Sequence, residues 1–163
     1  VSIAALNGVA VQTGLSLALS CDFRIASEAA RLMSGTLRFG LLPDEGGQYL
    51  LVQHMGVART RDFLMRNRMV DADEALVLGL VHEVVPHDEL MDKAREVANR
   101  LAVGSQQALR YTKRSLNQWL RQAEHMAFDY SLALEMLGFF GEDIQEGLDS
   151  VRERRDPKFP SAQ

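Results

Sequence analysis

Apolar residues are distributed in two different ways along this chain, and that change limits the possible folds more than any other feature. In the first part, short apolar runs alternate with glycines, and residues 2–6 and 23–26 are predicted as strands with a buried helix over 14–20 between them. In the second part, apolar residues recur at helical spacing, as over 90–101 and 144–151. The sequence therefore predicts an α/β unit followed by a helical region.

Local signals refine these boundaries. After a loop rich in glycine, a helix is expected from about residue 48, and a short strand is expected over 80–85. Asp71 stands three residues before Glu74, which is the spacing of a helix capping box. Ser105 can cap the helix that follows it, because serine is favoured at that position. These signals predict where helices begin in the second half of the chain.

Composition disfavours several classes of protein. The net charge of −4 argues against nucleic acid as the main partner, because phosphate binders usually carry a basic face. The single cysteine, Cys21, excludes an intrachain disulfide and fits a reducing, cytoplasmic compartment. The four histidines show no metal-ligand spacing, so no metal is expected. No apolar run approaches the ~20 residues of a membrane helix, so no membrane segment is expected.

The chain begins inside an apolar run, residues 1–6, without a charged leader. Such a run is typical of a buried strand, and a sheet of two or three strands would leave unpaired edges. We therefore expect a partial α/β core over residues 1–87 and a C-terminal helical region over 88–163, both belonging to a longer protein.

Three segments carry recognisable motifs. Residues 7–22 read NGVAVQTGLSLALSCD, residues 39–47 read FGLLPDEGG and residues 71–81 read DADEALVLGLV. Together they closely resemble the signature of the crotonase (enoyl-CoA hydratase/isomerase) superfamily, in which NG-x-A-x-GG-G precedes an apolar helix and C-D. Residues 108–113 and 154–159 are similar to the closing segments of the family. The resemblance covers nearly the whole chain, and the combination of motifs is specific.

The resemblance implies a fold and an assembly. It implies an α/β, crotonase-like ββα superhelix, here partial, followed by a C-terminal helical region through which the chains form homotrimers or hexamers. No segment matches the A-x-(S/G)-(A/G)-G-x-D loop, which in the family binds coenzyme A and supplies the first oxyanion-hole amide. The chain therefore resembles the carboxyl-terminal portion of a family member.

The resemblance also implies a substrate class. Family members act on acyl-CoA thioesters, whose carbonyl oxygen lies against two backbone N–H groups that stabilise an enolate. Coenzyme A enters as part of the substrate, and no separate cofactor is expected.

The second oxyanion amide falls on Thr13, beside Gly14 at the entrance of the first helix. Elementary physics agrees with this assignment, because the first N–H groups of a helix have no intrahelical acceptor. The family usually has two glycines where Gln12 and Thr13 stand, so a side chain here would narrow the approach of the thioester. The alternative is that Gly14 and its small neighbours only permit tight packing of strand and helix.

The two glutamates that position water in hydratases would fall on Ser16 and Thr36, and neither residue can act as a carboxylate base. Asp44 matches the position of an aspartate that handles protons or attacks the substrate in several crotonase isomerases and related enzymes. The alternative for Asp44 is to cap the following helix. Gln12, Ser16, Thr36 and Glu45 are further candidates for substrate binding. For Glu45 the alternative is a solvated loop charge.

Two basic residues, Lys113 and Arg155, are candidates for contact with the coenzyme A phosphates, although each also fits a solvated helix face. The favoured activity is double-bond isomerisation of an enoyl-CoA, with Asp44 as the acid and base. The alternatives are a hydratase with atypical catalytic residues, a non-catalytic acyl-CoA binder, and a purely structural subunit.

Overall fold

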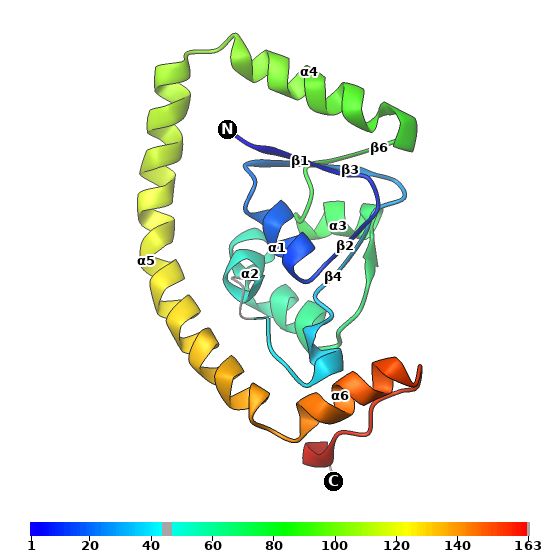
Figure 1. The fold of residues 1–163 in the computed structure, drawn as a ribbon. Helices are drawn as coiled ribbons and strands as arrows, with labels where there is room; N and C mark the ends of the chain where they lie inside the picture. Colours follow the sequence, from blue (N-terminus) through cyan, green and yellow to red (C-terminus); the bar gives the residue numbers. More distant parts are fainter. Residues whose placement is uncertain (44–46, 163) are drawn as a thin grey trace.

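The computed structural model describes residues 1–43 and 47–162 and has a mixed α/β architecture (Figure 1). Its first sheet has the strand order β1-β3-β6, in which both neighbouring pairs are parallel. The bounds of these strands are β1 (Ile3–Leu6), β3 (Phe23–Ser27) and β6 (Glu83–Val85). The three strands that the sequence predicts are therefore confirmed, although the last begins at Glu83 rather than at about Leu80.

A second sheet has the order β2-β4-β5 and is not evident in the sequence pattern. Strand β4 pairs in parallel with β2 and antiparallel with β5. The strands are β2 (Val9–Val11), β4 (Arg31–Met33) and β5 (Val70–Asp71). Strands of two or three residues are too short to show an alternation of apolar and polar residues, which explains why they were not predicted.

The order of the elements repeats along the chain. β1 and β2 are followed by α1 (Thr13–Leu19), and β3 and β4 are followed by the 3-10 helix η1 (Thr36–Phe39) and α2 (Gly47–Met65). Because β3 pairs in parallel with β1 and β4 with β2, the second unit stacks directly on the first. These are two turns of a ββα spiral, which confirms the predicted fold class.

The later helices are α3 (Ala72–Leu78), α4 (Leu90–Ala102), α5 (Gln106–Phe139) and α6 (Asp143–Arg152), with short 3-10 helices η2 (His87–Glu89) and η3 (Pro160–Ala162). None of the described helices is long and apolar enough to cross a membrane.

Both predicted caps are present. A carboxylate oxygen of Asp71 accepts the backbone N–H of Glu74 at 2.9 Å, and the Ser105 hydroxyl accepts that of Ala108 at 3.4 Å. The Glu74 carboxylate itself contacts the Arg68 guanidinium. Asp71 therefore caps the start of α3 as predicted. The side chain of Glu74, the other member of the predicted capping box, forms an ion pair with Arg68.

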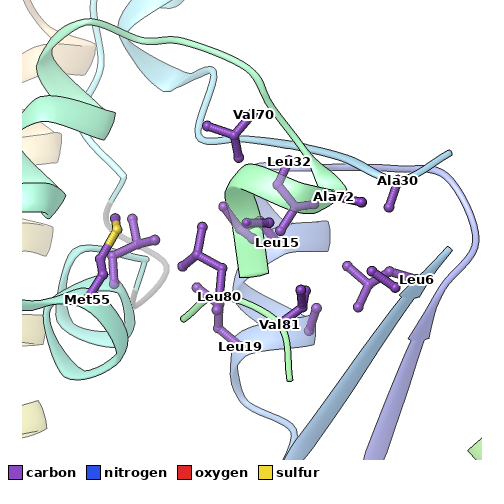
Figure 2. Packing of buried hydrophobic residues seen from close by; sticks show 14 of the residues in the cluster. Leu6, Leu15, Leu19, Ala30, Leu32, Met55, Val70, Ala72, Leu80 and Val81 are labelled. Carbon is purple, nitrogen blue, oxygen red and sulfur yellow. The ribbon is translucent and has the colours of Figure 1, made fainter. Parts of the chain in front are cut away.

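The main hydrophobic core lies between the two sheets and helices α1, α2 and α3. Figure 2 shows Leu15 and Leu19 of α1 directed toward Leu80, Val81 and Met55 from later parts of the chain. Complete burial of a leucine side chain stabilises a fold by ~1.5–3 kcal/mol. The inner face of α1 is therefore fixed by packing, and this fixes the position of its first turn.

Helix α4 covers the other face of the first sheet (Figure 1). Leu90 and Ala94 form a second buried cluster with Ile25 of β3. The helical region predicted from residue 88 onward is thus joined to the α/β part by a packed interface.

Helices α5 and α6 form an arm along the outside of the α/β part (Figure 1). α5 contacts α2, and α6 returns to pack against η1. The approach of α6 is close, because a Cβ atom at Gly147 would lie 2.6 Å from the Cα atom of Phe39. Large apolar side chains remain exposed along the arm, among them Tyr111, Leu116, Trp119, Tyr130, Leu137 and Phe140.

Candidate functional site

The first turn of α1 is the centre of the candidate site. Gln12, which precedes the helix, has φ 51° and ψ −124°. Its backbone N–H lies 3.2 Å from the carbonyl oxygen of Met33 and 3.1 Å from that of Ser34, at the end of β4. Its own carbonyl accepts the N–H groups of Leu15 and Ser16 at 2.9 and 3.0 Å. This conformation turns the chain sharply from β2 into the helix.

The turn leaves Thr13 and Gly14 exposed at the start of α1. As the first two residues of the helix, they have no intrahelical acceptor for their backbone N–H groups. A Cβ atom at Gly14 would meet no other atom within 4 Å, so the space beside it is open. A carbonyl oxygen of a ligand can therefore approach these backbone groups.

Buried hydroxyl groups lie next to this turn. Ser34 and Thr36 are both buried, and their hydroxyl oxygens lie 3.1 Å apart in a hydrogen bond. Gly35 between them has φ 82°, and its N–H donates to the side-chain carbonyl of Asn67 at 3.1 Å. A Cβ atom at Gly35 would lie 3.8 Å from Cγ of Gln12, which brings this strand end beside the turn.

Ser16 connects α1 with the start of α2. Its side chain is buried, and a Cβ atom at Gly47 would lie 3.2 Å from the Ser16 hydroxyl oxygen and 3.3 Å from Cβ of Pro43. Pro43 and the start of α2 therefore lie close to the helix that presents Thr13. Asp44 and Glu45 lie outside the described residues, so their assigned roles stay predictions.

One carboxylate that the sequence analysis did not select lies against the same loop. Glu135 of α5 is only 4% exposed, and its Oε2 atom accepts the backbone N–H of Leu42 at 2.9 Å. The available sequence signal is that Glu135 is the only charged residue in the segment 130–141, YSLALEMLGFFG. A lone charge in such a segment is unusual, because buried carboxylates require polar partners.

Comparison with known proteins decides the family. The family model for enoyl-CoA hydratase/isomerase matches residues 1–162. The chain belongs to the enoyl-CoA hydratase/isomerase family. It is 34% identical to a probable enoyl-CoA hydratase of Mycobacterium tuberculosis over 97% of this chain and 62% of that protein. It is also 34% identical to a short-chain-enoyl-CoA hydratase of Clostridioides difficile, over 93% of this chain and 97% of that sequence.

Solved structures of the enoyl-CoA hydratase/isomerase family agree. An enoyl-CoA hydratase from Mycobacterium avium subsp. paratuberculosis superposes with a TM-score of 0.91 at 31% identity, over 96% of this chain and 64% of that one. A carnitinyl-CoA hydratase from Mycobacterium avium superposes with a TM-score of 0.92 at 26% identity, over 98% of this chain and 62% of that one. The chain therefore spans about three fifths of the length of these relatives.

Lys113, one of the two basic residues proposed for coenzyme A in this family member, forms an ion pair. Its ammonium nitrogen lies 2.5 Å from a carboxylate oxygen of Asp22, which also accepts the backbone N–H of Ser2 at 2.7 Å. Burial alone would raise the pKa of Asp22, but the hydrogen bonds from Lys113 and Ser2 outweigh it and lower this pKa. The pair borders a cavity of about 590 Å³ at the C-terminal end of α1, opposite the end that presents Thr13.

Arg155, the other basic residue, is held by two glutamates. Its guanidinium nitrogens lie 2.5 and 2.9 Å from the carboxylate oxygens of Glu146 and 2.5 Å from Glu153. The hydrogen bond from Arg155, together with the backbone N–H of Lys158, lowers the pKa of Glu146 to about 2. A phosphate would have to compete with these carboxylates, so contact of Arg155 with coenzyme A stays a prediction.

The histidines and carboxylates of the chain provide no metal centre in the part that the structure describes. No group of three His, Cys, Asp or Glu side chains there could hold a metal ion. His54 and His82 instead bind the buried Arg24. Nδ1 of His54 lies 3.3 Å from the Arg24 guanidinium, and Nδ1 of His82 accepts the Arg24 backbone N–H at 3.0 Å. These two histidines are hydrogen-bonded parts of the fold.

Proposed function

We propose that this chain belongs to an enzyme that converts an acyl-CoA thioester through an enolate, and that the favoured reaction is double-bond isomerisation of an enoyl-CoA. The observation that carries the proposal is the exposed first turn of α1, where Thr13 and Gly14 present backbone N–H groups beside open space. Family membership supports acyl-CoA as the substrate class.

In this proposal the Thr13 N–H donates a hydrogen bond to the thioester carbonyl oxygen. When a base removes a proton from the α-carbon, negative charge moves onto that oxygen, and the hydrogen bond strengthens as the charge develops. Loss of one such donor costs about 3–4 kcal/mol in comparable enzymes. Returning the proton at the γ-carbon completes the shift of the double bond, and Asp44 is the proposed carrier of that proton.

The hydroxyl groups at Ser16 and Thr36 favour isomerisation over hydration. Both are buried, and neither is basic enough near neutral pH to activate water without help. Hydration by atypical residues is the second candidate, because several relatives at 33–34% identity are named enoyl-CoA hydratases. A non-catalytic acyl-CoA binder is the third.

We also propose a setting for this activity. The exposed apolar side chains of α5 support a homotrimer or a hexamer built from trimers, and the absence of predicted metal-ligand spacing supports a reaction without a separate cofactor. The proposed location is the cytoplasm, in the metabolism of fatty acyl-CoA.

An absorbance assay of the complete protein distinguishes these functions. Conjugated 2-enoyl thioesters absorb more strongly in the ultraviolet than 3-enoyl thioesters. Isomerisation of a 3-enoyl-CoA therefore raises the absorbance, while hydration of a 2-enoyl-CoA lowers it. We expect a rise with 3-enoyl-CoA and little change with 2-enoyl-CoA. A fall with 2-enoyl-CoA alone would select the hydratase, and calorimetric binding without turnover of either substrate would select the binder.

A further inference from the structure

The contact between Glu135 and the loop over residues 40–43 is not explained by any of the roles proposed above. Glu135 is the one acidic residue that is almost completely buried in the described part of the chain. Its Oε2 atom accepts the Leu42 N–H at 2.9 Å. Burying a carboxylate is costly unless hydrogen bonds compensate it, and hydrogen bonds to a charged acceptor are stronger than neutral ones. An apolar residue would fill the same space on α5 without this cost.

The arm and the loop fit together closely around this contact. A Cβ atom at Gly40 would lie 2.7 Å from Cβ of Asp143, at the start of α6. A Cβ atom at Gly138, three residues after Glu135, would lie 3.2 Å from a methyl carbon of Leu41. The backbones therefore approach where side chains are absent, and small shifts of the arm would be transmitted to the loop.

The loop leads directly to the candidate site. Leu42 is followed by Pro43, which is buried and packs at the start of α2 beside Gly47. The Ser16 hydroxyl, on the helix that begins at Thr13, lies near the same point, because a Cβ atom at Gly47 would be 3.2 Å from it and 3.3 Å from Cβ of Pro43. A continuous set of contacts thus joins Glu135 to the proposed oxyanion turn through the loop and α2.

We propose that Glu135 is a positioning residue for the reaction proposed above: its carboxylate fixes the 40–43 loop against α5 and thereby sets the geometry of the acyl site. This inference rests on the proposed function, because it assigns a role within the same site. The feature required of Glu135 is an acceptor oxygen for the Leu42 N–H. Glutamine has such an oxygen and the same length, while alanine has neither.

The test compares two substitutions in the complete protein with enoyl-CoA substrate. Glu135→Ala should lower kcat by about 10- to 100-fold with KM changed less than about threefold, because misplacement of a site by about 1 Å is that costly to turnover. Glu135→Gln should keep kcat within about threefold of the wild type and leave the shape of its pH profile unchanged. Asp129→Ala removes an exposed carboxylate from the same helix and should leave kcat unchanged.

The other outcomes overturn the inference in distinguishable ways. If Glu135→Gln loses activity as severely as Glu135→Ala and alters the pH profile, Glu135 itself transfers protons. If Glu135→Ala melts at a lower temperature but its folded form keeps the wild-type kcat, the residue is only structural. If Glu135→Ala does not fold, the intermediate variant Glu135→Asp, whose shorter side chain cannot reach the loop as well, replaces it in the comparison. A wild-type protein without turnover removes the proposed function, and this inference with it.

Discussion

The backbone of Gln12 adopts a conformation that is normally reserved for glycine. Its φ of 51° and ψ of −124° match the first central residue of a type II′ turn, where a Cβ atom is crowded. Residues held in such regions cost on the order of 1–3 kcal/mol each and persist only when their surroundings fix them. Here the contacts of the Gln12 N–H with Met33 and Ser34 provide that constraint.

Gln12→Gly should therefore stabilise the fold. Relief of about 1–3 kcal/mol of strain exceeds the extra chain entropy that glycine gives to the unfolded state, about 0.4–1 kcal/mol. We expect the free energy of unfolding, measured with urea, to rise by about 1 kcal/mol or more. Gln12→Ala keeps the Cβ atom and should change stability little. A destabilised Gln12→Gly variant would mean that the glutamine side chain contributes more than its backbone conformation costs.

Asp44→Asn tests the proposed acid and base. It should reduce turnover of the enoyl-CoA substrate by about 10²–10⁴-fold, the range typical of a lost acid or base group, while affinity for acyl-CoA changes little. Ser16→Ala should have little effect on turnover, because its hydroxyl is not proposed to carry protons. If Asp44→Asn instead keeps turnover and melts at a lower temperature, Asp44 is a helix cap.

At the scale of elements, Arg24 of β3 connects α1, α2 and the segment before β6. Its guanidinium donates to the carbonyl oxygens of Leu80 and Cys21, both at 2.7 Å, and to His54 of α2. A cation at the C-terminal end of α1 also interacts favourably with the helix dipole. Burial, and then the positive charge of Arg24, lower the pKa of both His54 and His82 below the ordinary value of 6.5.

This cluster predicts a loss of stability in acid. The pKa of His54 and that of His82 are lower in the folded state, so the unfolded state binds more protons once the pH falls below about 6.5. Stability is therefore fully present above about pH 6.5 and declines as the pH falls toward the folded-state pKa values. Urea unfolding between pH 8 and pH 5 measures this, and His54→Gln should flatten the decline. If the free energy of unfolding of His54→Gln falls with pH as steeply as that of the wild type, other groups cause the loss of stability in acid.

The sequence was sufficient for some elements and insufficient for others, for physical reasons. Helices α4 and α6 were predictable because their apolar residues repeat over several turns. The cap at Asp71 was predictable because it depends only on residues three positions apart. The helix that begins at Thr13 was predictable from its apolar run, whereas the oxyanion role of Thr13 comes from a motif and stays a prediction. The contact of Glu135 with Leu42 joins residues 93 positions apart, and no local pattern encodes such a pair.

At the scale of the whole molecule, the arm of α5 and α6 determines how much apolar surface remains uncovered. Leu116 and Trp119 of α5 are exposed, and so are Tyr130, Leu137 and Phe140 at and near its end. Exposed apolar side chains in such number favour association with other chains. We therefore expect the arm to contribute to a trimer interface.

Trp119→Glu tests the predicted interface. Trp119 is 65% exposed, and burying a charge in an apolar interface is unfavourable, so the variant should be mainly monomeric at micromolar concentration by light scattering. Val77→Glu, on α3, changes a side chain that is 74% exposed but lies off the arm, and it should leave the assembly intact. A monomeric wild-type protein would contradict the prediction.

The strand order of the two sheets has a practical consequence for anyone who handles this chain by itself. β1 and β2 each end a sheet, so in the described structure one side of each strand offers unsatisfied main-chain donors and acceptors. The opposite ends of the two sheets are β6 and β5, so pairing β1 or β2 of one chain with such an end of the next chain would be head-to-tail, and pairing of that kind need not close. Particles that grow without limit in a scattering experiment would thus report on exposed strand edges, whereas a sharp threefold mass would report on the arm.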